Sequence, residues 1–289
     1  MTTPPLSDAP VVDFRVRLPH DRRPAVEVPA SLSEGYDAVL GMGSTYDKTT
    51  ADLDRELTTA GVTHAVVHAE YELGDVADAL NETTAMVCAD DASRIGFGTV
   101  SLDAHSASRM VRQVRRVEAL GLRGINLQPS FFGRAIDDPL LYAVYAAAEE
   151  AGLVVAVHTG VNYSRAHPID GEQPVRLDRI ACAFESLRLV ACHAAWPWTA
   201  ELAAVARRHP QVYVEFGGVA PKYVNRPGTG WEPLRSLMDN VLADQVLFAS
   251  DWPALTPQRC LQEWRESDLK PTTLARLCGG NAQRLLAWP

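Results

Sequence analysis

Short apolar segments recur at regular intervals along the chain, and helical patterns separate most of them. The segments span residues 11–18, 63–68, 95–100, 124–128, 153–158, 189–193, 212–216 and 246–251. They are rich in valine and isoleucine and are bounded by glycine or proline, which is typical of strands buried on both faces. The pattern therefore predicts eight strands of a largely parallel sheet.

Helical periodicity fills the intervals between these segments, over residues 106–120, 138–151, 198–208, 257–266 and 272–286. In the first helix Met110, Val114 and Val117 share one face, and Gly121 stands where a C-terminal cap is expected. Asp138 followed by Pro139 is a typical helix start. Each interval of this kind returns the chain to the same edge of the sheet, so the strands are expected to run parallel.

Eight strands that alternate with helices close into a (β/α)8 barrel, the TIM barrel. An open doubly wound sheet is disfavoured because no glycine-rich phosphate loop follows the first strand, and GMGS at residues 41–44 is only a weak loop signal. No linker divides the chain, so we expect a single α/β domain over residues 1–289, with residues 1–10 as a disordered lead-in.

Composition narrows the class of protein. The chain has 289 residues and a net charge of −9, and such acidity argues against a general nucleic-acid binder and against binding to anionic membranes. No apolar run approaches the ~20 residues of a membrane span, and MTTPPLSDAP lacks the features of a signal peptide. The five cysteines include no CxxC pair, which favours reduced thiols. A cytoplasmic protein with a small-molecule substrate is expected.

Polar side chains stand at the predicted carboxyl ends of several strands, where barrels carry their active sites. His158, His193 and Asp251 end the fifth, sixth and eighth strands, and Asn126 and Gln128 lie on the fourth. In the first strand, Asp13, Arg15 and Arg17 are spaced by two and are expected on one face. The long loops over residues 19–50 and 217–231 are candidate lids.

At these residues the chain resembles a known family. The segments GLRGINLQPS, YAAAEEAGLVVAVHTG, LRLVACHAAWPW, VLFASDWP and LCGGNAQRLL, from about Arg123 to the C-terminus, are similar to the family-2 branch of the amidohydrolase superfamily. The resemblance implies a hydrolase of esters, lactones, amides or C–C bonds, or a decarboxylase or hydratase. It also implies that His158 binds a metal, that His193 is a ligand or an acid–base group, and that Asp251 binds metal or activates water.

The first strand departs from the family pattern. Where the family has DxHxH, with both histidines on the metal, this chain reads DFRVR, so Arg15 and Arg17 stand in their places. Arginine stays protonated and has no lone pair for a cation. The expected cofactor is therefore either none or one divalent ion, Zn or Mn, held by His158, His193 and Asp251. DFRVR and GVAPKYV also resemble a subgroup that includes β-ketoacyl-thioester hydrolase-like proteins.

Two interpretations are open for the charged residues of this group. Arg15 and Arg17 either form structural ion pairs with Asp13 or Asp251, or bind a substrate carboxylate or a developing oxyanion. Asp251 is the first candidate for a general base, and an ion pair with either arginine would lower its pKa and weaken it in that role. His158 and His193 are candidates to move protons.

Further side chains are expected to contact the substrate, and His68 is assigned no role. They are Asn126 and Gln128 on the fourth strand, Trp196 and Trp252 next to the catalytic tips, and Lys222 and Tyr223 on the seventh loop. The favoured reaction is hydrolysis of an ester, lactone, amide or activated C–C bond in a small carboxylate- or carbonyl-bearing substrate. The alternatives are a metal-independent lyase, decarboxylase or cyclase, and a catalytically dead barrel that binds a ligand. A homodimer is also expected.

Overall fold

A computed structural model describes residues 10–24, 38, 43, 45, 47–70, 76–163 and 165–288. Most of the predicted lead-in, of the GMGS segment and of the predicted first lid over residues 19–50 lies outside the described residues. Within them the eight strands are β1 Val12–Arg17, β2 His64–His68, β3 Arg94–Gly98, β4 Gly124–Leu127, β5 Val154–His158, β6 Leu189–Cys192, β7 Val212–Glu215 and β8 Val246–Leu247.

The strands form one parallel sheet in the order of the chain, from β1 to β8. The last strand meets the first: Phe14 N donates to Phe248 O over 2.9 Å, and Asp251 N donates to Arg15 O over 3.0 Å. These bonds close the sheet into a barrel. The predicted (β/α)8 TIM barrel in a single domain is confirmed.

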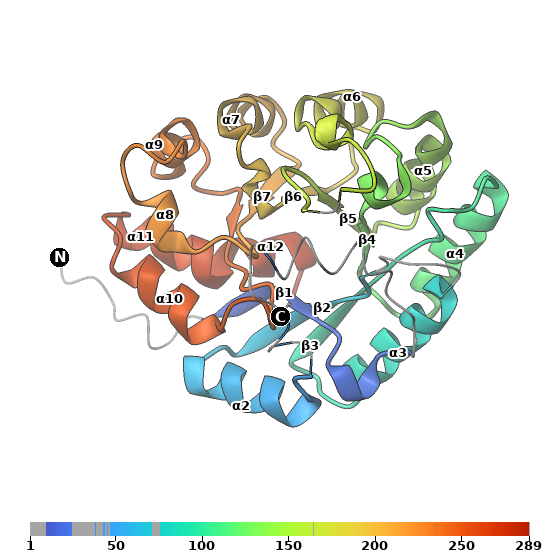
Figure 1. Cartoon of the computed structure of the whole chain (residues 1–289), viewed down its shortest axis with the longest axis horizontal. Helices are drawn as coiled ribbons and strands as arrows, with labels where there is room; N and C mark the ends of the chain where they lie inside the picture. Colours follow the sequence, from blue (N-terminus) through green and yellow to red (C-terminus); the bar gives the residue numbers. More distant parts are fainter. Residues whose placement is uncertain are drawn as a thin grey trace.

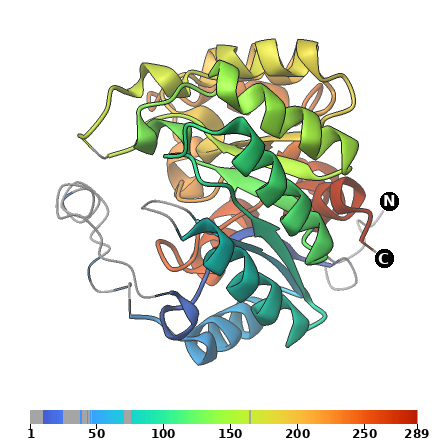
Figure 2. The same cartoon turned by 90° about the vertical axis from the view of Figure 1, so that its right-hand side faces the viewer.

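Helices surround the strands (Figure 1). The α-helices are α2 Thr50–Ala60, α3 Ala77–Ala89, α4 Ala107–Ala119, α5 Tyr142–Glu150, α6 Val175–Ala183, α7 Thr199–Arg208, α8 Pro221–Val224, α9 Glu232–Met238, α10 Pro257–Arg265, α11 Pro271–Ala275 and α12 Asn281–Leu286. Figure 2 shows the helices of the green and yellow part of the chain standing beside the strands as an outer layer. The helix predicted over residues 272–286 is divided, because a π-helical turn at Arg276–Gly280 separates α11 from α12.

Local sequence explains where these helices begin and end. Ser106 caps α4, since its side chain accepts a hydrogen bond from Arg109 N, and Gly121 just beyond the helix has φ +74°. Asp138 accepts from Leu140 N and opens the 3-10 turn Pro139–Leu141 that leads into α5. The predicted capping positions are therefore confirmed at both helices.

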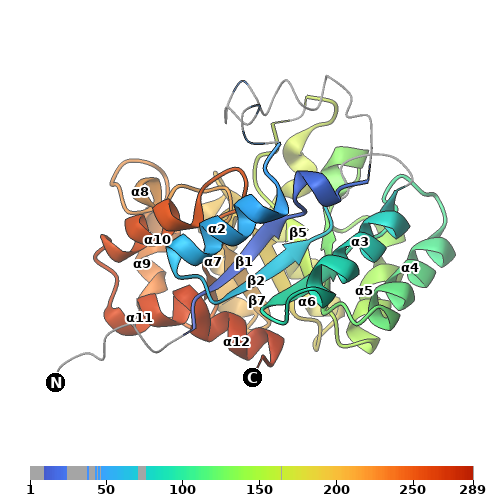
Figure 3. The same ribbon diagram turned by 90° about the horizontal axis from the view of Figure 1, so that it is seen from below.

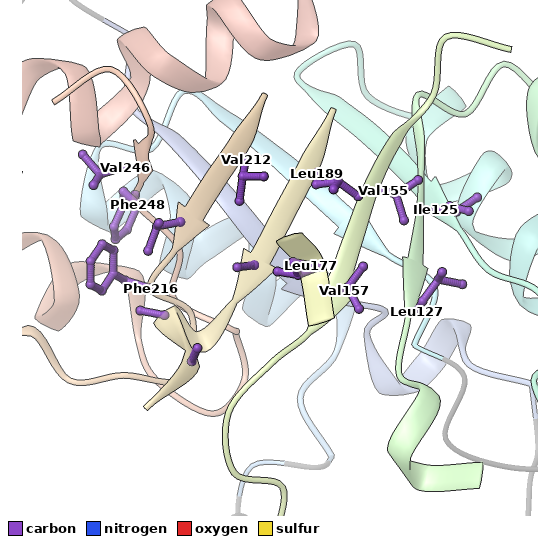
Figure 4. Close-up of a cluster of buried hydrophobic side chains, with 14 of the residues drawn as sticks. Ile125, Leu127, Val155, Val157, Leu177, Leu189, Val212, Phe216, Val246 and Phe248 are labelled. Carbon is purple, nitrogen blue, oxygen red and sulfur yellow. The ribbon is translucent and has the colours of Figure 1, made fainter. Parts of the chain in front are cut away.

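Two layers of buried side chains hold the barrel together. The larger one lies between strands and helices; Figure 4 shows Ile125 of β4 beside Val155 of the neighbouring strand β5, and Phe248 with Phe216 on the other side of the view. The second fills the barrel interior with residues such as Val12, Phe14, Phe97, Val154 and Leu247. Burial of each such side chain adds roughly 1.5–3 kcal/mol to the free energy of unfolding. The two layers together therefore give a stable scaffold on which a site can be positioned.

The two ends of the barrel differ. Ala282, Leu285 and Leu286 of α12 belong to the interior cluster, so this helix closes the end where the strands begin. Figure 3 shows α12 and the C-terminus at the end opposite the 3-10 turn His20–Arg22 that follows β1. A site is therefore expected at the other end of the barrel, where the carboxyl ends of the strands lie. No helix among the described residues is long and apolar enough to cross a membrane.

The expected alternation along β1 fails. The register between β1 and β2 shifts between Asp13 and Val16, and Phe14 joins Val12 in the interior cluster. Asp13 instead accepts hydrogen bonds from Ser250 N (2.9 Å) and Ser250 Oγ (2.6 Å). The prediction that Asp13 shares one face with Arg15 and Arg17 is therefore wrong, because the irregularity breaks the period of two.

Candidate active site

Charged and polar side chains from nearly every strand meet at the carboxyl end of the barrel. They come from β1, the end of β2, β4, β5, β6, β7 and the segment after β8, and comprise Arg15, Arg17, Glu70, Asn126, His158, His193, Glu215 and Asp251. Parallel strands place their ends on one rim of the barrel, so residues distant in sequence become neighbours. The sequence-predicted core of the site is thus brought together.

Arg15 is fully enclosed by protein groups. Its side chain is 1% exposed, and Nε contacts Oε2 of Glu215 at 3.2 Å while Nη1 contacts Oε1 of Glu70 at 2.9 Å. Its Nη2 donates to Oδ1 of Asn126 over 3.1 Å and lies 2.7 Å from Sγ of Cys192. All three nitrogens are therefore engaged within the barrel, where Arg15 balances two buried carboxylates. A substrate contact by Arg15 stays a prediction.

Arg17 and Asp251 form a two-point ion pair at the rim. Nε of Arg17 lies 3.1 Å from Oδ1 of Asp251, and Nη2 lies 2.9 Å from Oδ2. The Arg17 Nε also lies 3.0 Å from Oε2 of Glu70, and the Arg17 side chain is 12% exposed. This guanidinium stands nearer to solvent than that of Arg15, so a substrate contact by Arg17 stays a prediction.

The ion pair decides what Asp251 can do. Burial would raise its pKa, but the Arg17 guanidinium, with smaller contributions from His193 and Arg15, holds the pKa below its usual value. A carboxylate that is stabilised in this way is a weak base. The structure therefore favours the alternative in which Asp251 is chiefly the ion-pair partner of Arg17.

His193 is oriented by the backbone. Its Nδ1 lies 2.7 Å from the carbonyl oxygen of Gly217, which only accepts, so Nδ1 carries the proton and Nε2 keeps a lone pair. Burial, with the nearby imidazole of His158 next, lowers the pKa of His193 to about 3. His193 is therefore a neutral imidazole at physiological pH.

His158 lies against a buried carboxylate. Its Nδ1 lies 2.6 Å from Oε1 of Glu172, and the two side chains are 7% and 0% exposed. Glu172 lies in the 3-10 turn Ile169–Glu172 of the loop after β5. The ring centroids of His158 and His193 are 4.7 Å apart with an angle of 55° between the rings. Despite its short distance to Glu172, Nδ1 of His158 makes no hydrogen bond within the part of the chain that the structure describes. Two imidazoles thus lie close together at the rim, and the Nδ1 of His193 alone is hydrogen-bonded.

Backbone geometry also marks this end of the barrel. His193 and Asp251 both have φ 58°, in the left-handed region that residues other than glycine seldom adopt. Such conformations concentrate at functional sites, where the surrounding structure compensates for the strain. Two of the three strand tips predicted to carry the chemistry are therefore held in strained backbone, and Ala194, Ala195 and Ala287 are the other non-glycine residues of the described chain with positive φ.

The six predicted substrate contacts fall into different environments. Asn126 Nδ2 and Gln128 Oε1 are buried without a hydrogen-bond partner among the described residues, so both fit a polar ligand. Trp196 is 41% exposed, and Lys222 and Tyr223 of α8 are exposed with the Lys222 Nζ 5.0 Å from the Tyr223 ring centre. Substrate contacts by these five residues stay predictions.

Trp252 does not lie where the sequence predicts it. It is 0% exposed, packs in the layer between strands and helices, and donates from Nε1 to Oε2 of Glu56 on α2 over 3.1 Å. Trp252 pairs with Val16 as an isolated bridge at the seam of the barrel, which sends its side chain outward. The prediction that it lines the substrate pocket is wrong.

Sequence reasoning missed several members of the site. Glu70 and Glu172 supply carboxylates to Arg15 and His158, and Ser130 and Asn162 bind Glu172. The available signal was an acidic residue just beyond the end of β2 and another in the loop after β5. His68 is fully buried, with Nε2 2.9 Å from Phe14 O and Nδ1 without a hydrogen-bond partner among the described residues, so its lack of a chemical role stays a prediction.

A cavity of about 390 Å³ lies elsewhere, at the opposite end of the barrel. Arg94, Leu122, Arg123 and Trp288 are among the residues that line it. It contains none of the predicted site residues. The concentration of buried charges and unpartnered polar atoms, rather than this cavity, therefore identifies the candidate site.

Comparison with known proteins agrees with this architecture. A family model described as "Amidohydrolase" matches residues 12–288. An uncharacterized TIM-barrel protein from Bordetella bronchiseptica is 25% identical, with a TM-score of 0.80 over 96% of this chain and 98% of that one. A 5-carboxyvanillate decarboxylase from Novosphingobium aromaticivorans, complexed with manganese and 4-hydroxy-3-methoxy-5-nitrobenzoic acid, is 17% identical, with a TM-score of 0.71 over 99% and 98% of the chains.

A further relative matches a shorter part of this chain, at a higher identity than these two solved structures. The 2-amino-3-carboxymuconate-6-semialdehyde decarboxylase of Dictyostelium discoideum is 31% identical over 86 residues. That alignment spans 29% of this chain and 23% of the relative's length.

The residues of the candidate site do not fit a divalent ion. Both oxygens of Asp251 face the Arg17 guanidinium, and Arg15 supplies a second positive charge. Among the described residues, a group with all its ligand atoms within 4.8 Å of one another is formed by Asp178, Cys182 and His209, and His158, His193 and Asp251 form none. The expectation of either no cofactor or one Zn or Mn ion stays a prediction.

Proposed function

The chain belongs to the amidohydrolase family, and from that premise we propose that it removes a carboxyl group as CO2 from a small carboxylic acid. The reaction class is that of a lyase. It is the alternative that the sequence placed second, and the site geometry supports it better than hydrolysis. The acid would carry a carbonyl or a hydroxylated ring next to the reacting carbon, so that the electrons released have a place to go.

One observation carries the choice of reaction. Asp251, the residue expected to activate water, presents both carboxylate oxygens to Arg17 at 3.1 and 2.9 Å. Hydrolysis requires a base that deprotonates water, and an ion-paired carboxylate of lowered pKa serves poorly. Decarboxylation requires no water activation; it needs a group that delivers a proton to carbon, and two imidazoles stand at the rim.

The step balances without another reactant. The bond between the reacting carbon and the carboxyl group breaks, CO2 leaves, and the bonding electron pair stays on the carbon, where the adjacent carbonyl or ring delocalises it. An imidazolium proton then forms the new C–H bond with that electron pair. The positive charge of Arg17, whose side chain is 12% exposed at the rim, favours the developing negative charge.

The substrate class follows from the groups that line the site. Asn126 Nδ2 and Gln128 Oε1 are buried and await polar partners, so a donor and an acceptor on the ligand are expected to meet them. The relative that is 31% identical over 86 residues is named "2-amino-3-carboxymuconate-6-semialdehyde decarboxylase", which supports the same reaction class.

Isotopes test the proposal directly. The purified protein is incubated with small β-keto acids, unsaturated dicarboxylic acids and hydroxylated aromatic acids, in D2O and separately in water labelled with ¹⁸O. We expect CO2 release and one deuterium on the carbon that lost the carboxyl group, with no ¹⁸O in the remaining product. Incorporation of ¹⁸O without CO2 release would overturn the proposal and establish hydrolysis.

Hydrolysis of an ester, lactone, amide or C–C bond is the second candidate, and a different observation favours it. His193 is neutral, its pKa lies at about 3, and Nε2 retains a lone pair that can accept a proton from water. In that case His193, not Asp251, is the base. Replacement of His193 by glutamine would then abolish ¹⁸O incorporation, whereas Asp251→Asn would leave part of it.

A further inference from the structure

The cavity of about 390 Å³ at the opposite end of the barrel has a largely apolar wall. It lies where β3 and β4 begin, and its lining comes from the end of α3, the turn between α4 and β4, and the last residues of the chain. Leu120, Leu122 and Trp288 are among the apolar residues of this lining. Sites that bind small molecules have volumes of roughly 300–1,000 Å³, so the cavity is large enough for a small ligand.

The indole of Trp288 is held in the wall from two directions. Its ring centre lies 4.4 Å from that of His64, with an angle of 69° between the rings. Ala287 ends α12 in the left-handed region with φ 47°, and beyond this turn Trp288 N donates to Gln283 O over 3.0 Å. The cavity wall thus includes a flat aromatic surface with a fixed position.

A buried guanidinium supplies a polar group to the lining. The Arg94 side chain is 5% exposed, and its Nη2 pairs with Oδ1 of Asp54. Its Nε lies 3.4 Å from Oδ2 of Asp91, yet it makes no hydrogen bond within the part of the chain that the structure describes. Buried donors are normally hydrogen-bonded, so this N–H group is available to a further acceptor.

A second guanidinium stands at the mouth of the cavity. Arg123 is exposed, and its Nη2 donates to Leu286 O over 3.0 Å. Two carboxylates balance Arg94, whereas no ion pair joins Arg123 to a carboxylate among the described residues. Burial raises the pKa of the Cys88 thiol in the lining to about 12, so this thiol is neutral at physiological pH. The lining therefore carries one uncompensated positive charge.

We propose that this cavity binds a small amphipathic carboxylate, with its apolar part against Leu122 and Trp288 and its charged end at Arg123. The free N–H of Arg94 Nε would donate to one carboxylate oxygen. A single negative charge matches the uncompensated positive charge, which favours a carboxylate over a doubly charged phosphate. The apolar wall requires an apolar body on the ligand, because its burial supplies most of the binding energy. The inference does not depend on the proposed decarboxylation, since the cavity contains none of the candidate active-site residues.

A matched control variant is available close to Arg123. Nη1 of Arg188 donates to Leu285 O over 2.7 Å, so this guanidinium binds the neighbouring carbonyl of α12, but it does not line the cavity. Burial, with the charge of Arg123 next, lowers the pKa of Arg188, which places the two guanidinium groups in the same region. Arg123→Met and Arg188→Met thus remove equal charge from the same end of the molecule, and only the first alters the cavity.

The experiment uses hexanoate as the probe and compares it with hexanol, which lacks the charge, and with inorganic phosphate. Binding is followed through the indole N–H signals of the six tryptophans in nuclear magnetic resonance spectra. The signals of Trp288 and of Trp196 at the other rim are assigned by their loss in Trp288→Phe and Trp196→Phe. We expect hexanoate to shift the Trp288 signal saturably and hexanol to bind more weakly. Arg123→Met should raise the dissociation constant of hexanoate about tenfold or more, and Arg188→Met should leave it nearly unchanged.

Each alternative result has a distinct meaning. No saturable shift of Trp288, or a shift of Trp196 alone, overturns the inference, because hexanoate would then bind only at the candidate active site or not at all. Hexanol that binds as tightly as hexanoate would show that the cavity does not select a negative charge, and phosphate that binds more tightly would overturn the carboxylate class. Equal weakening in Arg123→Met and Arg188→Met would also overturn the inference, since a general positive potential would then attract the probe.

Discussion

Arg17 and Asp251 face one another across the seam where β1 meets the segment after β8, with Nε 3.1 Å from Oδ1 and Nη2 2.9 Å from Oδ2. The same seam carries the backbone bond from Asp251 N to Arg15 O, 3.0 Å long. Closure of the barrel and charge balance at its rim are thus achieved by the same few residues. A change to either partner is expected to affect both stability and chemistry.

Arg17→Met should leave Asp251 buried without its counter-charge. Removal of one partner of a buried ion pair costs roughly 3–5 kcal/mol of unfolding free energy. Asp251 has a depressed pKa in the folded protein, so its contribution is present above its unfolded pKa and is lost as the pH falls through the folded value. The difference in unfolding free energy between the unaltered protein and the variant is measured by chemical denaturation. It should be largest near neutral pH and should shrink on acidification.

The double variant Arg17→Met with Asp251→Asn is the control for this prediction. It removes both charges, so part of the lost stability should return if the cost arises from an unpaired carboxylate. A double variant that is as unstable as the sum of the two single variants would show that the two side chains contribute independently.

The sequence predicted the elements of the barrel because each strand and helix is encoded locally. Eight apolar segments, Ser106 before α4 and Gly121 after it are short-range signals, and all of them hold in the structure. The shift in register between Asp13 and Val16 has no comparable signal. It arises from the fit of β1 between β2 and β8, which is a tertiary effect.

Partners within the site were harder to predict for the same reason. Arg15 was recognised as an anomaly, but its partners Glu70 and Glu215 stand 55 and 200 residues away along the chain. Whether an inward arginine binds substrate or balances carboxylates depends on side chains that only the closed barrel brings near. Trp252 was misassigned because the pairing at the seam, not its position after Asp251, decides the direction of its side chain.

Asp13→Asn should change how stability depends on pH. Burial, opposed by hydrogen bonds from Ser250 and the Arg15 backbone, raises the pKa of Asp13 from 3.8 to about 7. The folded protein then binds a proton that the unfolded chain releases, so stability falls as the pH rises from about 4 to about 7. This loss amounts to at most roughly 4 kcal/mol. Because asparagine does not titrate, the stability of the variant should decline less over that pH range.

Denaturation curves of both proteins at several pH values between these limits would measure the difference. The comparison is made between the two proteins at each pH, which cancels the titration of all other groups. Parallel stability profiles would contradict a raised pKa at Asp13.

The purified protein should contain little transition metal, and added metal should not change its stability. The donors of the candidate site do not fit a divalent ion, so we expect well below one equivalent of transition metal by elemental mass spectrometry. An ion present at 100 times its dissociation constant would add about 2.7 kcal/mol to stability, so addition of Mn²⁺ or Zn²⁺ should leave the melting temperature unchanged. One equivalent that disappears in His158→Ala would instead establish a metal site with fewer ligands.

Gly218→Ala should reduce turnover by more than the accompanying loss of stability explains. A Cβ at Gly218 would lie 3.2 Å from Oδ2 of Asp251 and 3.4 Å from Nδ1 of His193, and its φ is +69°. Gly121, with φ +74° and nothing within 4 Å of its added Cβ, is the matched control. Both replacements should cost about 1 kcal/mol of stability through backbone strain.

Turnover distinguishes the two glycine variants. Gly121→Ala should keep the activity of the unaltered protein after correction for the folded fraction, because its added methyl group meets nothing. Gly218→Ala should lose activity because it displaces Asp251 or His193. Equal activities in both variants would show that the loop after β7 does not have to approach these side chains closely.

The two tryptophans that follow the catalytic tips should behave oppositely. Trp196 is 41% exposed at the rim, whereas Trp252 is fully buried and bonds Glu56. Trp252→Ala should cost roughly 3–5 kcal/mol of stability with little change in KM for the protein that remains folded. Trp196→Ala should leave stability within about 0.5 kcal/mol and raise KM if its ring contacts substrate. Denaturation and steady-state kinetics on the same preparations separate these effects, and a Trp196→Ala variant with normal KM would remove that residue from the substrate site.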